Sequence, residues 1–230
     1  MRGRRLLTPP TDRKFPRRMP SNPPPGLDHL VYAVPDLRSG IDAVERLLGA
    51  RAEIGGRHPR YGTHNALLSL GPQTYLEIVA ADPELPRPDR GRPFGVEAPG
   101  LPRLATWVLR DEAIEERAAR AAAAGLSLGA VLGGERARPD GSLVRWRLTD
   151  PYAMPVDGIV PFLIAWSSTP HPGAGAPSAG TLVGLRAEHP APEVLRQALS
   201  ALAIELDVAA ASRPALVATL KVGDRIVELR

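Results

Sequence analysis

The alternation of apolar and polar residues predicts a strand, a helix and further strands within the first 81 residues. A strand is expected over Leu27–Val34, where the side chains alternate with the two-residue period of β-structure. A helix is expected over Asp36–Leu48, because Asp36 is a good N-cap and apolar residues then recur at helical spacing. A glycine loop at Gly55–Pro59 leads to two more strands, Thr63–Leu70 and Thr74–Ala80.

The same pattern starts again near residues 104 and 182, so the chain carries an internal repeat of about 77 residues. The second unit is expected to hold one helix, Asp111–Ala124, and four strands: Leu104–Leu109, Leu128–Leu132, Leu143–Leu148 and Phe162–Trp166. The third unit is shorter, with a strand at Leu182–Ala187, a helix at Pro192–Leu202 and a hairpin formed by Ala215–Val222 and Arg225–Leu229.

Charge is distributed unevenly along the 230 residues, whose net charge is +4. Residues 1–25 hold seven basic residues and one acidic residue, together with many prolines, so this tail is expected to be disordered. The remainder carries 22 basic and 24 acidic residues and is therefore not a basic domain, which argues against nucleic-acid binding. Two explanations of the tail stay open: translation begins at Met19, or the tail contacts an acidic partner.

Several classes of function lack the residues that they need. The chain has no cysteine, which excludes disulfides, thiolate metal sites and a cysteine nucleophile, and fits a cytoplasmic protein. It contains no glycine-rich phosphate loop, nucleophile elbow or HExxH motif. No apolar run approaches the roughly 20 residues that span a bilayer, so no membrane association is expected.

His29 and Glu77 are the candidate reactive residues, because they lie on the first and last strands of the first unit. If these strands are neighbours, the two side chains meet on one face of the sheet. His64 lies on the strand between them, and if it points the same way, the three residues form a metal site of two imidazoles and a carboxylate. The alternatives are a core histidine at His29, a hydrogen-bonding role for His64, and a salt bridge between Glu77 and Arg57.

Four other positions are weighed for smaller roles. Arg57 and His58 would clamp an anionic substrate group or only shape the glycine loop. Asn65 is assigned to substrate binding as well. His171 lies in a connector rich in proline and glycine, and we assign it no role. The three tryptophans at strand positions, Trp107, Trp146 and Trp166, are expected to fill the core.

The order of elements, together with short motifs, resembles glyoxalase-like domain proteins of the vicinal oxygen chelate superfamily. The motifs lie in the first unit and at the end of the second: Asp28–Val31, Val34–Leu37, Gly55–Pro59, Gly62–Leu67, Tyr75–Ile78, Pro161–Trp166 and His171-Pro172. The resemblance implies an α+β fold in which repeated βαβββ modules form a cupped mixed sheet with helices outside, followed by a C-terminal βαββ unit. The implied division is a tail (1–25), paired modules (26–166, from 26–81 and 100–166), a linker (167–180) and the C-terminal module (181–230).

In that superfamily the metal ligands come from the first and last strands of the two modules. Carried over to this chain, those positions are His29 and Glu77 in the first module. The second module departs from the pattern, because Leu104 and Ile164 occupy the matching positions and cannot bind a metal. The resemblance therefore implies half of a ligand set, which His64 would extend.

Two functions remain open on these grounds. The first is a metal-assisted enzyme of lyase, isomerase or dioxygenase type that acts on a small oxygenated substrate, with Glu77 as the catalytic group. Its metal, bound by His29, His64 and Glu77, would be Fe, Mn, Zn or Ni. The second is a metal-free protein that sequesters a small molecule, as bleomycin-resistance proteins do. Both imply a small-molecule ligand, and the sequence leaves a homodimer open.

Overall fold

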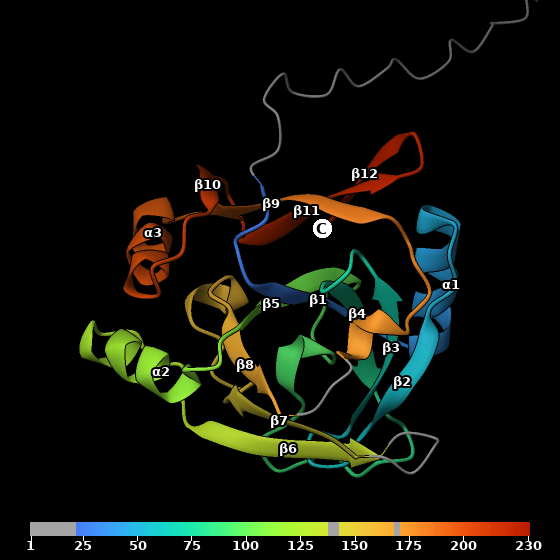
Figure 1. Ribbon diagram of the computed structural model, residues 1–230, viewed down its shortest axis with the longest axis horizontal. Coiled ribbons are helices and arrows are strands. Elements are labelled where there is room, and N and C mark those ends of the chain that lie inside the picture. Colours follow the sequence, from blue (N-terminus) through green and yellow to red (C-terminus); the bar gives the residue numbers. More distant parts are fainter. Residues whose placement is uncertain (1–21, 138–142, 168–170) are drawn as a thin grey trace, which may run out of the picture.

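The computed structural model describes residues 22–137, 143–167 and 171–230. Most of the expected basic tail, residues 1–21, lies outside these ranges. The described chain forms two sheets, the larger of which curls into a cup (Figure 1).

The larger sheet has eight strands in the order β2-β3-β4-β1-β5-β8-β7-β6. The first half is β1 (Leu27–Ala33), α1 (Leu37–Leu48), β2 (Glu53–His58), β3 (Thr63–Ser69) and β4 (Tyr75–Ala81). The second half is β5 (Arg103–Arg110), α2 (Ile114–Ala123), β6 (Val131–Ala137), β7 (Leu143–Thr149) and β8 (Phe162–Trp166). Each half is a βαβββ module, as expected.

The two halves meet at the centre of the large sheet, where β1 pairs antiparallel with β5. Within each half the first strand lies parallel to the last, β1 beside β4 and β5 beside β8. Residues His29 and Glu77, 48 positions apart in their numbering, thus lie on adjacent strands. Both halves of the cup come from one chain, so the cup does not need a second copy.

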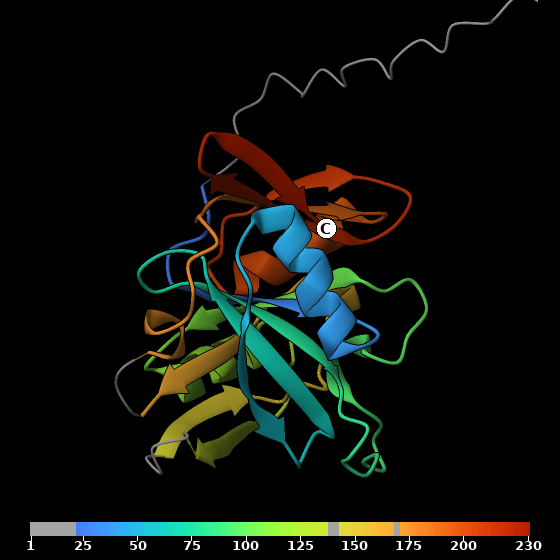
Figure 2. The same cartoon turned by 90° about the vertical axis from the view of Figure 1, so that its right-hand side faces the viewer.

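The smaller sheet follows the second half and lies across the outside of the large one (Figures 1 and 2). Its elements are β9 (Thr181–His189), α3 (Pro192–Ala201), β10 (Asp207–Ala210), β11 (Ala215–Val222) and β12 (Arg225–Leu229), with strand order β10-β9-β11-β12. The short strand β10 was not expected from the sequence. It lies at an edge and pairs only with β9, and its four residues are too few to show a two-residue period.

Helix α1 forms where the pattern predicted it, for the expected reasons. The Asp36 side chain accepts a hydrogen bond from the Ser39 backbone N–H, and Gly49 ends the helix with a φ of 77°. Its buried stripe of Ile41, Val44 and Leu48 packs on the outer face of the sheet. Figure 2 shows the helix lying along the outside of the strands.

Three boundaries in the first and second halves differ from the expectation. The strand expected over Leu128–Leu132 lies further along the chain, because β6 occupies Val131–Ala137 and pairs with β7. Gly55–Pro59 is not a loop, because β2 occupies Glu53–His58 and pairs with β3. The sequence pattern did not predict this strand, because its glycines supply no alternating side chains. Helix α2 starts at Ile114 and not at Asp111, whose carboxylate instead accepts a hydrogen bond from the Ala113 N–H at 2.8 Å.

The sheet separates two apolar cores. The outer core joins the convex face, the helices and the smaller sheet, and includes Leu30, Trp107 and Leu185. The inner core lines part of the hollow of the cup and includes Val31, Val79, Val108 and Phe162. The inner core is smaller, which leaves room in the hollow for polar side chains.

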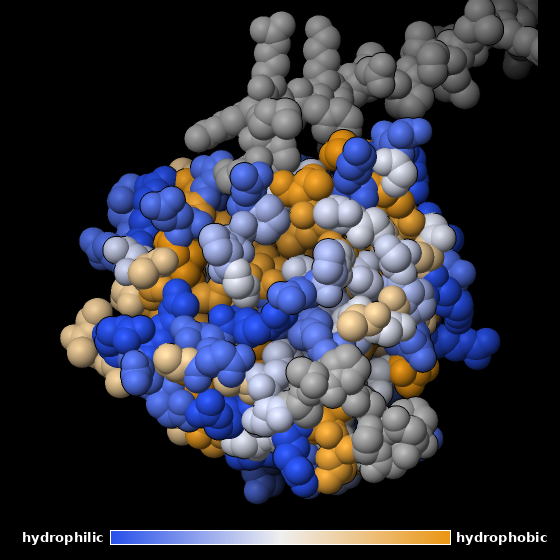
Figure 3. All heavy atoms as spheres, viewed as in Figure 1, coloured by the Kyte–Doolittle hydropathy of each residue, from blue (hydrophilic) through white to orange (hydrophobic). Residues whose placement is uncertain are grey.

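None of the helices in the described ranges is long and apolar enough to cross a membrane. On the face shown in Figure 3, hydrophilic side chains cover much of the surface and apolar ones show between them.

Candidate functional site

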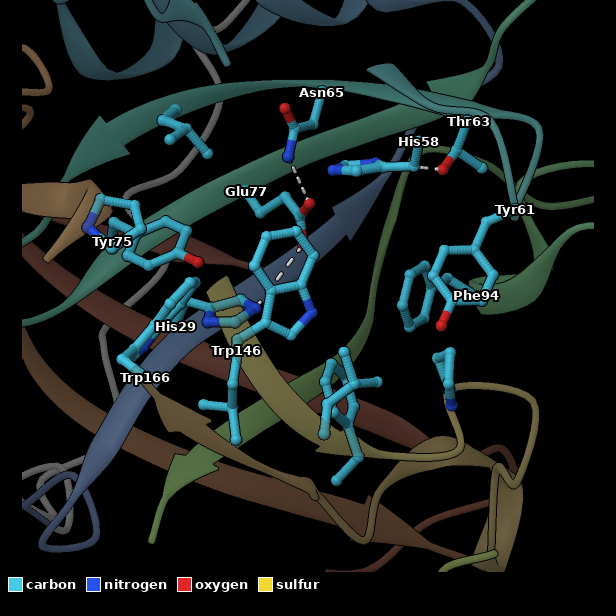
Figure 4. A pocket seen from close by; sticks show the side chains of 16 residues that line it. His29, His58, Tyr61, Thr63, Asn65, Tyr75, Glu77, Phe94, Trp146 and Trp166 are labelled. Atoms are coloured by element: carbon cyan, nitrogen blue, oxygen red, sulfur yellow. Dashed lines mark hydrogen bonds and ion pairs between the residues drawn. The ribbon is translucent and has the colours of Figure 1, made fainter. Parts of the chain in front are cut away.

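A pocket opens into the hollow of the cup, with walls of different character (Figure 4). The polar side chains of its lining come from β1 to β4 and include His29, His58, Thr63, Asn65, Tyr75 and Glu77. The wall from the second half is apolar and aromatic, with Trp146, Leu148, Phe162, Ile164 and Trp166. The cavity has a volume of about 80 Å³, which suits a small organic group.

His29 and Glu77 meet at the polar wall, as the strand alternation predicted. In the parallel pairing of β1 with β4, His29 lies beside Tyr75 and Val31 beside Glu77, so the two polar side chains are diagonal neighbours. The distance between His29 Nε2 and Glu77 Oε2 is 3.6 Å. Both residues are buried, with exposed fractions of 3% and 8%.

Asn65 holds the Glu77 carboxylate from the neighbouring strand. Its amide Nδ2 donates to Glu77 Oε1 at 2.5 Å, and its Oδ1 accepts from the backbone N–H of Gly56 at 2.9 Å. A Cβ built on Gly55 would lie 2.4 Å from Asn65 Oδ1, so a glycine is required where β2 passes this side chain. Asn65 therefore links the edge strand β2 to the acid of the site.

The His29 ring is fixed from two further directions. Its Nδ1 lies 2.7 Å from Oδ1 of Asp28, and its face stacks on Tyr75 with the ring centroids 4.4 Å apart. The edge of Phe162 approaches from the second half, at a centroid distance of 6.1 Å. The imidazole can therefore offer only Nε2 to the pocket.

Asp28 was not among the candidates, because regular alternation would place it on the opposite face from His29. A bulge at the start of β1 changes this, since the pairing with β5 shifts between Leu27 and His29. The side chain of Asp28 is fully buried. Burial alone would raise its pKa, but hydrogen bonds from His171 and His29 outweigh this effect and hold the pKa of Asp28 far below its ordinary value.

His58 lies at the other end of the polar wall. Its Nδ1 is 3.3 Å from the hydroxyl oxygen of Thr63, and both residues line the pocket, as does Tyr61. His58 and Asn65 thus both line the pocket, and their role in substrate binding stays a prediction.

The structure does not bring His64 to His29 and Glu77. His64 pairs with Ala80 across β3 and β4, and Ala80 belongs to the outer core, so the imidazole lies on the convex face. Its nearest acidic partner is Asp82, at 3.8 Å from Nδ1. The strand period explains the difference: Asn65, one residue further on, takes the inward position.

Arg57 also lies away from the pocket lining. Its guanidinium donates two hydrogen bonds to Asp82, at 2.7 and 3.1 Å, and one to Glu84 at 2.9 Å. It therefore has acidic partners on the chain itself, and neither the substrate clamp nor the alternative pairing with Glu77 describes its contacts. Asp82 and Glu84 were not among the partners considered for Arg57, because their contact depends on how β2 lies beside the end of β4.

Two tryptophans of the pocket lining and one histidine behind it were not predicted from the sequence. Trp107 is in the core as expected, but Trp146 and Trp166 line the pocket. His171, to which we assigned no role, bonds Asp28 Oδ2 through Nε2 at 3.1 Å. The only available signal was the position of Trp146 and Trp166 on the last two strands of the second unit, which also fits a core role.

The matching positions of the second half hold no metal ligand. Val108 pairs with His29 in the sheet, and Phe162 and Ile164 face the pocket from β8, whereas Leu104 belongs to the outer core. Leu104 is therefore not the counterpart of His29, because a second bulge in the β1–β5 pairing shifts the faces of β5. Throughout the described ranges, no group of three or more His, Cys, Asp or Glu side chains is placed to hold a metal ion.

The donors that are present fit a divalent ion bound by two protein atoms. Metal–ligand bonds of about 2 Å place neighbouring ligand atoms roughly 3 Å apart, close to the separation of His29 Nε2 and Glu77 Oε2. Asp28 on the far nitrogen of the ring is the kind of carboxylate that orients a metal-binding histidine. The same donors do not fit a site with four protein ligands.

Comparison with known proteins places this arrangement in a family. The family model described as a glyoxalase-like domain matches residues 27–203, well over half of the chain. A search of curated proteins by sequence finds no match.

The similar solved structures share little sequence identity with this chain. A hypothetical protein from Staphylococcus aureus is 13% identical with a TM-score of 0.58, covering 89% of this chain and 98% of that one. A variant of Streptomyces coelicolor methylmalonyl-CoA epimerase, in complex with 2-nitronate-propionyl-CoA, is 16% identical with a TM-score of 0.42, covering 62% and 97%. Methylmalonyl-CoA epimerase from Mycobacterium tuberculosis is 16% identical with a TM-score of 0.39, covering 69% and 95%. The family model covers well over half of the chain, and the chain therefore belongs to the family of glyoxalase-like domain proteins.

Proposed function

We propose that the protein is an enzyme that moves a proton on a small oxygenated substrate, with Glu77 as the base and a divalent ion as assistant. The observation that carries this proposal is the buried pair of His29 Nε2 and Glu77 Oε2, 3.6 Å apart at the end of a pocket. Among lyase, isomerase and dioxygenase reactions, this pair supports the first two, because proton transfer is what a buried carboxylate can do.

The pair requires a positive charge between its two members. Asp28 accepts from Nδ1 of His29, so a neutral ring turns an unprotonated Nε2 toward Glu77. A bare nitrogen and an ionised carboxylate oxygen repel each other at this distance. Either a proton or a metal ion relieves the repulsion, and both belong to the chemistry that we propose.

Glu77 is held so that one oxygen stays free for the substrate. Asn65 occupies Oε1, and Oε2 faces His29 and the pocket. A proton taken from carbon next to a substrate carbonyl would pass to Oε2 and return to the neighbouring atom in an isomerisation, or stay there while a leaving group departs in a lyase reaction.

Before the substrate binds, a divalent ion would be held by His29 Nε2 and Glu77 Oε2. Substrate oxygens would replace Oε2 as ligands when Oε2 acts as the base. Bound there, the ion would polarise the substrate oxygen and so acidify the adjacent C–H bond. Zn, Mn, Fe and Ni all accept this combination of imidazole and carboxylate. The apolar wall formed by Trp146, Phe162 and Trp166 would hold the rest of the substrate and exclude water.

Metal titration of the purified protein tests the proposal. We expect chelator-treated wild type to bind Zn²⁺ or Mn²⁺ in calorimetry, and Glu77→Gln and His29→Ala to lose at least tenfold in affinity, since each removes one of two ligands. The matched control is His64→Ala, which removes an imidazole from the same sheet on its convex face and should leave the affinity unchanged. Equal affinities in wild type and Glu77→Gln, or a loss in His64→Ala, would overturn the metal assignment.

A metal-free binding protein is the second candidate, and the aromatic wall is the observation that favours it. All six lining residues from the second half are apolar or aromatic, and Trp146 and Trp166 approach each other with ring centroids 5.8 Å apart. Thermal-shift screening with small aromatic compounds separates the two functions. Sequestration predicts a ligand-induced shift that survives His29→Ala and disappears in Trp146→Ala, whereas the enzyme predicts a metal-induced shift that His29→Ala abolishes.

A further inference from the structure

Asp28 carries chemistry that the proposed reaction does not use directly. It occupies the extra position of the bulge in β1, so that its carboxylate and the imidazole of His29 reach each other although they are adjacent in sequence. Its side chain is completely buried. A buried carboxylate away from water requires donors, and four side chains supply them.

These donors come from four separate segments. Oδ1 faces Nδ1 of His29 at 2.7 Å. Oδ2 accepts from Arg110 Nε at 2.8 Å and from Trp166 Nε1 at 3.0 Å, and Nη2 of the Arg110 guanidinium lies 2.7 Å from Oδ2 as an ion pair. It also faces His171 Nε2 at 3.1 Å. Arginine and tryptophan side chains can only donate, so Asp28 is an acceptor, and each ring nitrogen that faces it must carry a hydrogen.

The hydrogen bonds of His171 agree with this assignment. Its Nδ1 faces the backbone N–H of Gly173 at 3.3 Å, and a backbone N–H can only donate. Nδ1 of His171 is therefore the unprotonated nitrogen and Nε2 carries the hydrogen that Asp28 accepts. Both histidines thus have their tautomers set by one carboxylate.

We infer that Asp28 is a positioning residue that keeps the hydrogen of the neutral His29 ring on Nδ1 and leaves Nε2 open toward Glu77. The stack on Tyr75 fixes the plane of the ring, and Asp28 fixes which nitrogen faces the pocket. The role of this tautomer rests on the proposed function, because a metal ion or a transferred proton binds to an unprotonated Nε2. The tautomer itself depends only on the contacts of Asp28.

The tautomer can be measured without metal or substrate. Long-range ¹H–¹⁵N correlation spectra of chelator-treated protein, recorded above the ordinary range of histidine titration, distinguish the two nitrogens of a neutral ring. In the wild type we expect the hydrogen of His29 on Nδ1. In Asp28→Asn we expect it on Nε2, because the amide that replaces Oδ1 donates to Nδ1 while the amide oxygen keeps the donors on the other side.

The matched control is His171→Gln, which changes another donor to the same carboxylate and should leave the His29 tautomer as in the wild type. A wild-type ring with its hydrogen on Nε2, or with hydrogens on both nitrogens throughout, would overturn the inference. Asp28→Asn also leaves the Arg110 guanidinium facing a neutral amide in place of a carboxylate, and if the variant does not fold, the wild-type spectrum alone decides.

A second measurement links the tautomer to the site. If His29 binds a metal, Asp28→Asn should weaken Zn²⁺ binding by about 10- to 100-fold, the loss typical of a carboxylate behind a metal-binding histidine. A changed tautomer with no metal binding in either protein would support the positioning role and contradict the metal assignment. An unchanged tautomer together with intact metal binding would contradict the positioning role and support the metal assignment.

Discussion

At the scale of single residues, the candidate site depends on pairs of buried polar side chains that hydrogen-bond to each other. Glu77 is buried among apolar neighbours, and the amide of Asn65 is the donor that holds it at 2.5 Å. Burying a carboxylate costs free energy unless it accepts a hydrogen bond. A hydrogen-bond donor that faces Glu77 across the sheet therefore identifies its partner better than a charged residue elsewhere in the unit does. The sequence offered Arg57 and His64 as partners, and the strand register selected Asn65.

Asn65→Ala is expected to lower the free energy of unfolding by about 1–3 kcal/mol, since it leaves both the Gly56 N–H and a Glu77 oxygen without their partner. Urea denaturation of the wild type and the variant measures this cost. Ser69→Ala is a control on the same strand, because its hydroxyl bonds only the nearby backbone of Gly71. A cost for Asn65→Ala no larger than that for Ser69→Ala would contradict the linking role of Asn65.

At the scale of elements, the edge strand β2 is tied to the end of β4 by an ion pair on the convex face. Asp82 follows β4, is buried, and accepts two hydrogen bonds from Arg57 on β2. Burial alone would raise the pKa of Asp82. The Glu84 backbone N–H and the Arg57 guanidinium outweigh it and hold the pKa of Asp82 below its ordinary value.

This lowered pKa predicts how stability depends on pH. Asp82 binds its proton more readily in the unfolded chain, where its pKa is about 3.9, so its contribution is complete above that pH and declines as the pH falls through the lower folded value. The stability advantage of wild type over Asp82→Asn should therefore be largest near neutral pH and shrink below about pH 4. Urea denaturation over this range provides the measurement, and an advantage independent of pH would contradict the pairing.

At the scale of the whole molecule, the outer core joins the two sheets into one unit. Leu185, Leu216 and Leu220 of the smaller sheet belong to the same cluster as Leu30 and Trp107 of the larger one. The smaller sheet is thus placed to support the strands that carry His29 and Glu77 from behind. The smaller sheet is paired only within residues 181–230 among the described strands, and its apolar side chains pack in one core with those of the large sheet.

A substitution in the smaller sheet should therefore destabilise the large sheet. All three tryptophans lie in the large sheet, at positions 107, 146 and 166, so their fluorescence reports on that sheet alone. Leu220 is fully buried, and Leu220→Ala should lower the unfolding free energy seen by tryptophan fluorescence by about 2–5 kcal/mol. Val194→Ala, at an exposed position on α3, serves as the control. If fluorescence shows the same midpoint for Leu220→Ala and wild type, the two sheets unfold independently.

Much of the architecture was determined by the sequence alone. The order of elements, the N-cap at Asp36 and the inward direction of His29 and Glu77 follow from periodicities of 3.6 and 2, which act within one element. The same periodicities did not predict the glycine-containing strand β2 or the short strand β10, because neither presents an alternating pattern.

Only the tertiary structure decided what surrounds the two reactive residues. The bulges that bring Asp28 to His29 and turn Leu104 outward depend on how β1 pairs with β5, and a shift of one residue moves a side chain to the other face of a sheet. Long-range packing also brought Trp146, Trp166 and His171 to the site, although they lie more than 100 residues along the chain from Asp28 and His29. A strand's own sequence states which residues alternate, but its partners determine where that alternation breaks and what each side chain meets.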